Sequence, residues 1–309
     1  MKGFFNINKP RGMNSTKVVA IIKRLTHEKV GHLGTLDPDA HGVLPIAVGK
    51  ATRLFDFFLN KDKVYEARGR FGVLTDTLDE SGRVVLMNDV RPTRAQLEAV
   101  LPLFCGKQMQ MPPAFSAKQV DGERAYDKAR RGEKVTLTPR EICVYSLELL
   151  SSEGDEFSVR INCSAGTYVR ALIRDIAEKL GAIATTIDIF RTRSGAFDIA
   201  SSISIDNICH CERSVAIPPL EVTAHNCHCE EQSDVAIPTL RLISIEDALS
   251  GQEKVRLTEP QVKNLLCGRG QSIPYKDAKN VLFLTPEGDT YGLGDIENEQ
   301  IRITAFLLD

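Results

Sequence analysis

The chain has 309 residues, of which 42% are hydrophobic and 26% are charged, so it is long enough for a full core and two domains. No apolar run approaches the roughly 18 residues that a membrane span needs, and the first residues lack the apolar region of a secretion signal. The net charge of −2 argues against a uniformly basic nucleic-acid binder, and eight Cys in a chain of this size indicate a reduced cytosolic protein.

The hydrophobic pattern predicts the following elements in chain order. Residues 3–8 form a strand, Ser15 or Thr16 caps a helix that continues to about Leu25, and residues 31–45 form a loop. The later elements are a strand over 63–73, a helix over 93–104 with Thr93 as its N-cap, strands over 141–150 and 156–163, a helix over 167–182, and strands near 281–285, 290–293 and 300–306. Strands and helices are interspersed without a regular βαβ rhythm, which favours an α+β fold with a mixed or antiparallel sheet.

Basic residues gather in the first half of the chain. Residues 1–30 contain seven Lys and Arg against one acid, and residues 107–134 contain seven basic groups against four acidic ones. A polyanion could bind a basic face made by these segments, although solvated surface lysines give the same pattern.

The first candidate site is the loop "GHLGTLDPDAHGVLP", residues 31–45, which places Asp37 and Asp39 between His32 and His41. Its glycines permit close approach of a ligand, and its two prolines stiffen the backbone. A rigid loop of this kind suits a carboxylate nucleophile or base. The alternative is an ordinary turn in which an Asp accepts hydrogen bonds from nearby amides.

The segment "VGKAT", residues 48–52, is a poor match to a phosphate-binding loop. Six residues separate Gly42 from Gly49, and Ala51 stands where Ser or Thr is required. We therefore expect no nucleotide cofactor.

The second candidate site is "CSAGTYVRALIRDIAEKLG", residues 163–181, in which Tyr168 and Arg170 stand at the start of a helix. An Arg that reaches a buried Asp favours its ionised form, and a Tyr beside it can stack on a base. A solvated Arg and a packed Tyr remain the alternative.

Residues 206–241 contain a near-repeat, "CHCERSVAIP" followed by "CHCEEQSDVAIP", with four of the eight Cys and three of the six His. These groups are potential Zn²⁺ ligands, but the usual ligand pairs are separated by at least two residues, so C-x-C pairs match poorly. We expect no metal site and interpret the segment as an insertion.

Six segments, taken in order, resemble the bacterial tRNA pseudouridine synthase B (TruB) family. They are "GFFNINKPRGMNS", "GHLGTLDPDAHGVLPIAVGKATRL", "KVYEARGRFGVLTDTLDESG", "QMPPAFSAKQVDGERAYDKARRG", "CSAGTYVRALIRDI" and "FRTRSGAF". The resemblance is dense over about residues 3–205, and residues 242–309 are more weakly similar to the small RNA-binding PUA-like domain of that family.

The resemblance implies an α+β pseudouridine synthase fold with a mixed, mainly antiparallel central sheet and a small C-terminal β-rich PUA-like domain. The implied domains are a catalytic domain over 1–205, with an insert at 107–134 that closes over RNA, and the PUA-like domain over 242–309. The 206–241 insertion has no counterpart in the family.

The activity implied by the resemblance is the isomerisation of a uridine in the T-arm loop of tRNA, at the expected position 55, to pseudouridine. The C1′–N1 bond breaks, the base turns, and C1′ joins C5, so the reaction needs no cofactor, metal or ATP. The base must leave its stack to be reached. The implied partner is the tRNA T-arm, and we expect a cytoplasmic monomer that does not bind membranes.

The resemblance also assigns roles to individual residues. Asp37 is the catalytic nucleophile, whereas the family requires no acid at Asp39. His32 is expected to pack on the flipped nucleotide or to fill its place, and Tyr65 to stack on the uracil and help to remove the C5 proton. Tyr168 lines the pocket, and Ile189 forms an apolar wall where the family has Leu. Arg170 pairs with Asp37, and Lys9 supports the site. Phe190 departs from the family, which commonly has Arg there, and predicts a weaker phosphate or loop contact.

Two readings compete with this one. A non-catalytic RNA chaperone or binder would keep the fold but does not need Asp37, Tyr65 and Arg170 together. A metal-dependent interaction module would be carried by residues 209–229. Whether the nucleophile attacks C1′ or C6, or stabilises a glycal route, stays open at this stage.

Overall fold

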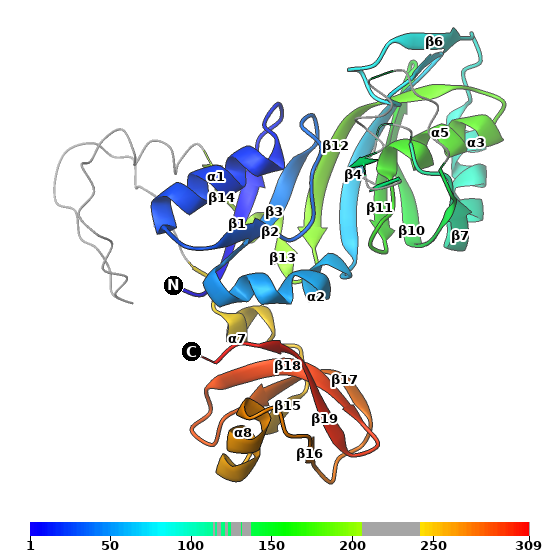
Figure 1. Ribbon diagram of the computed structural model, residues 1–309. Coiled ribbons are helices and arrows are strands. Elements are labelled where there is room, and N and C mark those ends of the chain that lie inside the picture. Colours follow the sequence, from blue (N-terminus) through cyan, green and yellow to red (C-terminus); the bar gives the residue numbers. More distant parts are fainter. Residues whose placement is uncertain are drawn as a thin grey trace. The chain divides into compact units, whose positions relative to one another are not determined.

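The computed structural model describes residues 1–113, 115, 119–120, 123–124, 131, 137–205 and 242–308. The chain divides into two compact units, which are coloured by sequence in Figure 1. Unit 1 comprises Met1–Thr35, Leu44–Phe55 and Ala200–Asp309, and unit 2 comprises Leu36–Val43 and Asp56–Ile199. The predicted 206–241 insertion, with its Cys/His near-repeat, and much of the predicted 107–134 insert lie outside the described residues.

Unit 2 is built on a mixed sheet with the strand order β3-β12-β4-β11-β10-β7. Its strands are β3 (His41–Val48, of which the first three residues belong to this unit), β4 (Lys63–Phe71), β7 (Gly106–Gln110), β10 (Arg140–Glu153), β11 (Glu156–Cys163), β12 (Ala184–Ser194) and β13 (Phe197–Asp198). Strand β12 is parallel to β3, whereas all other neighbours in this order are antiparallel. The expected mixed, mainly antiparallel central sheet is therefore confirmed.

Two helices pack on one face of this sheet, as Figure 1 shows. They are α3 (Arg94–Val100) and α5 (Val169–Lys179), and their apolar residues join those of β4, β10 and β11 in one buried cluster. Burial of each large apolar side chain contributes roughly 1.5–3 kcal/mol. Thr93 caps α3 with a capping box that Gln96 completes, as the sequence predicted for the cap. The opposite face carries charged side chains such as Arg68, Arg160 and Glu156.

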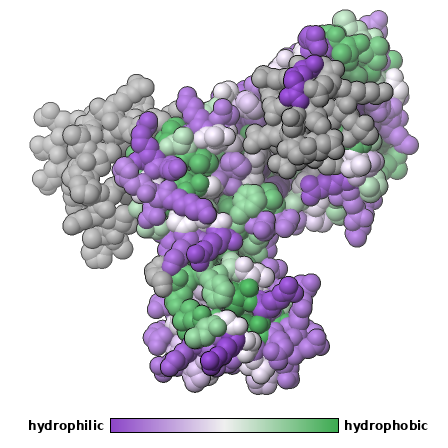
Figure 2. All heavy atoms as spheres, in the orientation of Figure 1, coloured by the Kyte–Doolittle hydropathy of each residue, from purple (hydrophilic) through white to green (hydrophobic). Residues whose placement is uncertain are grey.

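The remaining elements of unit 2 are short. They are α2 (Phe55–Leu59), the hairpin strands β5 (Val73–Thr75) and β6 (Val84–Met87), the 3-10 helix η2 (Leu101–Phe104), and the strand pair β8 (Gln119–Val120) and β9 (Glu123–Arg124). All residues of strand β6 are exposed to solvent, and their exposed fractions range from 53% at Leu86 to 70% at Met87. Figure 2 shows an apolar surface at this end of unit 2. Such an edge is unusual, because it offers both apolar side chains and unpaired backbone groups to solvent.

The N-terminal part of unit 1 contains β1 (Gly3–Lys9), α1 (Ser15–Thr26), β2 (Val30–His32) and the rest of β3. Helix α1 is capped by Asn14, whose side chain accepts a hydrogen bond from the Lys17 amide at 2.8 Å, so the predicted cap at Ser15 or Thr16 was wrong. Both residues lie inside the first turn instead. Asn is as good an N-cap as Ser, and it stands one residue earlier.

The prediction of a loop over residues 31–45 was correct only for its middle. Its first residues pair with β3 in register Val30↔Val48, Gly31↔Ala47 and His32↔Ile46. The apolar run after His41 continues as β3. Only Ile46–Val48 of this strand pair with β2, and the preceding residue, Pro45, has no N–H to donate. Only the segment between the two strands is irregular.

Residues 242–309 of unit 1 contain a five-stranded sheet with the order β15-β17-β18-β19-β16. Its elements are α7 (Ile245–Ala248), β15 (Lys254–Arg256), α8 (Glu259–Leu266), β16 (Gln271–Ser272), β17 (Ala278–Leu284), β18 (Thr290–Glu297) and β19 (Gln300–Phe306). This bears out the β-rich, PUA-like C-terminal part of the expected fold. Also in unit 1 are η1 (Gly49–Leu54) and β14 (Ile203–Ser204), and η3 (Ile199–Ser201) begins at the last residue of unit 2. Arg53 of η1 donates to the Phe306 carbonyl at 2.7 Å.

Candidate active site

Asp37 stands at the first position of a tight turn. The Ala40 amide donates to the Asp37 carbonyl at 3.1 Å, and Pro38 occupies the second position, where its fixed φ suits the turn. Leu36 and Ala40 on either side are buried, so the turn is anchored while 49% of the Asp37 side chain stays exposed. The chain thus presents one carboxylate from a short, stiff segment of unit 2. Asp39 lies exposed in the same turn.

The strand that follows this turn is held close to β12. Gly42 has a φ of +100°, and a Cβ atom there would stand 2.3 Å from the Arg191 carbonyl oxygen. Only glycine fits both the backbone conformation and this approach. The glycine therefore fixes where the Asp37 turn joins the sheet.

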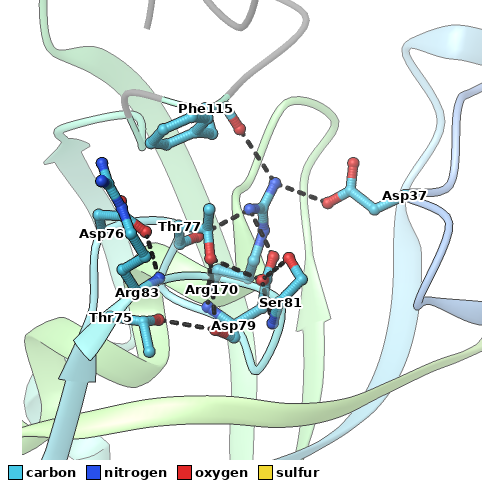
Figure 3. Close-up of polar contacts among 9 residues, drawn as sticks. All are labelled: Asp37, Thr75, Asp76, Thr77, Asp79, Ser81, Arg83, Phe115 and Arg170. Carbon is cyan, nitrogen blue, oxygen red and sulfur yellow. Dashed lines mark hydrogen bonds and ion pairs between the residues drawn. The ribbon is translucent and has the colours of Figure 1, made fainter. Parts of the chain in front are cut away.

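Arg170 lies in the first turn of α5 and is almost fully buried, with 8% of its side chain exposed. Its Nη2 atom is 2.7 Å from the Asp37 carboxylate, and its Nη1 atom is 2.9 Å from the Asp79 carboxylate. It also donates to the Thr77 carbonyl at 2.8 Å and to the Phe115 carbonyl at 3.2 Å. Figure 3 shows the guanidinium between the two carboxylates. The structure therefore contains the predicted ion pair between Asp37 and Arg170.

Asp79 is itself held by the turn that carries it. Its Oδ1 atom accepts hydrogen bonds from the Thr77 hydroxyl at 2.6 Å and the Ser81 hydroxyl at 2.6 Å, which leaves Oδ2 for Arg170. The Thr75 hydroxyl donates to the Asp79 carbonyl at 2.7 Å (Figure 3). Leu78 adopts a left-handed φ of 64°, which is a costly conformation for a leucine and marks a tightly determined turn.

Tyr65 and Ile189 come from the neighbouring strands β4 and β12, on the face that α5 covers. Both are partly buried against the same apolar cluster. Burial raises the pKa of Tyr65, and the nearby Asp37 charge adds to that rise, whereas a hydrogen bond and the charge from Arg191 oppose it. The Asp37 carboxylate is thus one of the charges that act on the Tyr65 phenol.

Tyr168 is the N-cap residue of α5, and its backbone is clamped by a buried glutamine. Gln110 accepts a hydrogen bond from the Tyr168 amide at 2.8 Å and donates to its carbonyl at 3.0 Å. Gln110 is 2% exposed, so both of its polar groups are paired out of water. This clamp fixes the start of the helix that carries Arg170.

Comparisons with known proteins show the family of this chain. Residues 23–169 match the family model described as "TruB family pseudouridylate synthase (N terminal domain)". A tRNA pseudouridine synthase B of Syntrophomonas wolfei is 36% identical over 91% of this chain and 94% of its own length. That of Caldanaerobacter subterraneus is 44% identical over 67% of this chain and 73% of its own length. This chain belongs to the TruB family of pseudouridylate synthases. It is accordingly an isomerase, as the six sequence segments indicated.

Solved structures of the same fold extend the likeness over the TruB-family chain as a whole. The crystal structure of a Cbf5-Nop10-Gar1 complex contains a chain with a TM-score of 0.69 and 25% identity, covering 99% of this chain and 84% of that one. A structure of an H/ACA RNP bound to a substrate RNA containing 2′-deoxyuridine gives a TM-score of 0.67, also at 25% identity.

His32 and Lys9, the other two predicted site residues of this TruB-family chain, belong to unit 1. His32 is the half-buried last residue of β2. Lys9 is the last residue of β1 and is fully buried, and its ammonium donates to the carbonyls of Pro10 at 3.0 Å and Met13 at 2.5 Å. Lys9 thus closes the turn that follows β1.

Asp79, Gln110 and Arg191 were not identified from the sequence as site residues. Asp79 lies in "TDTLDESG", which predicts a turn and carries no sign of its distant partner. Gln110 and Arg191 contact residues 58 and 148 positions away, at Tyr168 and Val43. The sequence signal for all three was that they fall within segments that resemble the family: Asp79 in "TDTLDESG", Gln110 at the start of "QMPPAF" and Arg191 in "FRTRSGAF".

Within the part of the chain that the structure describes, no three His, Cys, Asp or Glu side chains are grouped as metal ligands. The cluster at residues 209–229 lies outside that part. None of the described helices is long and apolar enough to cross a bilayer.

Proposed function

We propose that this protein isomerises a uridine in the T-arm loop of tRNA, at the expected position 55, to pseudouridine, with Asp37 as the nucleophile. The observation that carries the proposal is the ion pair of 2.7 Å between a half-exposed Asp37 and a buried Arg170. Relatives along most of the chain are tRNA pseudouridine synthases B, which supports tRNA as the substrate.

The reaction balances without a redox partner or added water. The C1′–N1 bond breaks, the base turns, and a C1′–C5 bond forms; C5 then loses one proton while N1 gains one. Arg170 keeps the Asp37 carboxylate at a fixed place, and the exposed side of that carboxylate is open to a nucleotide. The same placement serves attack at C1′, attack at C6, or support of a glycal route.

Five further residues have roles in this proposal. Tyr65 stacks on the target uracil and takes part in removal of the C5 proton, and Ile189 provides the apolar wall beside it. Tyr168 lines the pocket, and the Gln110 clamp on its backbone supports that role. His32 packs on the everted nucleotide or fills the place that it leaves, because a base must leave its stack to be modified. Lys9 supports the site through the turn after β1.

Phe190, on β12, stands where the family commonly has Arg, and it lies against His41. Their rings stack at 4.6 Å with an interplanar angle of 13°, and His41 lies 3.2 Å from the Asp188 carboxylate. One face of the Phe190 ring is thereby covered by the His41 ring. This arrangement supports the expected weaker contact with phosphate or with the RNA loop.

For the whole chain we propose a catalytic domain over 1–205, an insert at 107–134 that closes over RNA, and an RNA-binding PUA-like domain over 242–309. We further propose that the protein acts as a monomer in the cytoplasm, where its tRNA substrate is found, and that 206–241 is an insertion without a counterpart in the family.

The test is to incubate the purified protein with unmodified tRNA transcripts and to map pseudouridine along them. We expect a single modified uridine in the T-arm loop, and none in a transcript with cytidine at that position. Modification only outside the T-arm, or none in any tRNA, would contradict the proposal.

A further inference from the structure

Arg191 is a buried charge that the proposed mechanism has not used. Its side chain lies on β12, it is 1% exposed, and its Nε atom donates to the Val43 carbonyl at 2.7 Å. Burying a guanidinium is costly unless its other donors also find partners. Its direct neighbour across the strand pair is Tyr65.

The Tyr65 phenol lies under the influence of two opposite charges. Arg191 donates a hydrogen bond to Tyr65, and the Asp37 carboxylate acts on it with the opposite sign. Burial first, and then the Arg191 charge, lowers the pKa of Lys63 at the start of β4 to about 8. Because Arg191 and Tyr65 are direct partners in the antiparallel β12–β4 pair, their side chains lie on the same face, which places a permanent positive charge beside the phenol.

The last step of the isomerisation needs a group that accepts a proton. After C1′ has joined C5, the C5–H bond must break so that its electron pair restores the C5=C6 double bond. A phenol oxygen can take that proton only after releasing its own. The number of protons balances, since Tyr65 releases one, N1 gains one, and Tyr65 regains its proton from C5.

We propose that Arg191 is a positioning residue for this deprotonation, and that its guanidinium holds the Tyr65 oxygen in place as a proton acceptor. The proposal rests on the function proposed above and adds a residue to it. Arg191 stabilises the negative charge that develops on the phenol while Tyr65 exchanges its proton. Burial and Asp37 both make that charge costly, which is why a donor is needed at this place.

A purely structural role is the competing explanation, because Arg191 also holds the Val43 carbonyl. The test therefore needs a measurement that responds to proton removal and not to folding. We choose Arg191→Lys and Arg191→Gln, which keep a donor for Val43 but lose the planar, charged fork. Arg193→Lys is the matched control, since Arg193 lies two residues further along β12 and is paired with Val64 on the β4 side.

The experiment follows single-turnover pseudouridine formation in a tRNA transcript with hydrogen or deuterium at C5 of the target uridine. For both Arg191 variants we expect a rate about 10-fold to 100-fold lower, as for loss of a hydrogen bond to a charged group. We also expect a larger deuterium isotope effect than in the unaltered protein, because C5–H cleavage becomes the slow step. Arg193→Lys should change neither quantity.

A lower rate with an unchanged isotope effect would overturn the proposal and leave Arg191 a residue of the fold. Loss of cooperative unfolding in both variants would overturn it in the same way. A transcript with 5-fluorouridine, which has no C5 proton to lose, separates this proposal from the proposed function. Its C1′–N1 bond can still break and its C1′–C5 bond can form, after which water adds across C6=N1, because C5=C6 cannot be restored while C5 carries fluorine. The Arg191 variants should consume 5-fluorouridine by this route as fast as the unaltered protein does, whereas failure of the unaltered protein to act on either transcript would count against the proposed function.

Discussion

Arg170 determines the geometry of the site more than any other residue, because one guanidinium binds two carboxylates and two backbone carbonyls. Its planar fork carries donors on three nitrogen atoms, whereas a lysine in the same place would have all its donors on one nitrogen. Asp79 binds one side of the fork and is fixed by its own turn. The other side of the fork, at Nη2, pairs with Asp37, so the position of the Asp37 carboxylate depends on Asp79 as well.

Replacement of Asp79 tests this dependence. In Asp79→Asn the charge that holds Nη1 of Arg170 is lost, so Arg170 can turn away from Asp37. We expect single-turnover pseudouridine formation to fall about 10-fold to 100-fold, with tRNA affinity within about twofold, from the usual value of a charge-assisted hydrogen bond. The control is Asp76→Asn in the same turn, since Asp76 pairs with the exposed Arg83. Equal activity of the two variants would refute the dependence.

Tyr291 in the C-terminal sheet has a buried hydroxyl without a hydrogen-bond partner among the described residues. An unpaired buried hydroxyl costs about 1–3 kcal/mol. Tyr291→Phe should therefore raise the free energy of unfolding, by up to about that amount, in a denaturant titration. Tyr275→Phe is the control, because the Tyr275 hydroxyl is paired with Glu253 at 2.5 Å. A destabilised Tyr291→Phe variant would show that the hydroxyl is satisfied in solution.

At the scale of elements, local patterns predicted some structures and missed others. Thr93 with Gln96 three residues later is a capping box, and the alternating residues around "SSEGDE" gave the β10–β11 pair, because both signals are local. Strand β12 was not identified, although it carries Ile189 and Arg191. Its sequence alternates weakly, and its register with β4 shifts near both ends, so only the pairing with its neighbours defines it.

Strand β4 begins with a buried amine, which makes stability depend on pH. Lys63 is 5% exposed, and burial first, then the Arg191 charge, lowers its pKa from 10.5 to about 8. Between pH 8 and 10.5 the unfolded chain therefore binds more protons at Lys63 than the folded chain, so the free energy of unfolding rises with pH. Cys163 acts in the opposite direction above pH 9, because its pKa is raised from 9.0 to about 11.

The rise due to Lys63 should consequently be visible between pH 8 and pH 9. We expect the free energy of unfolding to increase by up to about 1.4 kcal/mol over that unit, as measured by denaturant titration at both pH values. Lys63→Met should remove the increase. Lys107→Met, at a side chain that is 77% exposed, should keep it. A flat profile in the unaltered protein would show that Lys63 is not desolvated.

At the scale of the whole molecule, the site is assembled from segments that are far apart in the chain. Asp37, Tyr65, Asp79 and Arg170 all belong to unit 2, and Arg170 lies 91 residues from Asp79. Resemblance to the TruB family predicted the Asp37–Arg170 ion pair, which the structure contains, and the role of Tyr65 stays a prediction. The contacts of Asp79, Gln110 and Arg191 depend on long-range pairing, which neither spacing nor periodicity in the sequence expresses.

The central claim is that Asp37, held by Arg170, forms the reactive contact with the target uridine. The most direct measurement compares the unaltered protein with Asp37→Asn for single-turnover pseudouridine formation and for tRNA binding. Asn has nearly the same shape but is neither charged nor nucleophilic, so we expect product formation to fall by at least about 1,000-fold while tRNA affinity changes little. Product formation by Asp37→Asn at a rate near that of the unaltered protein would contradict the account.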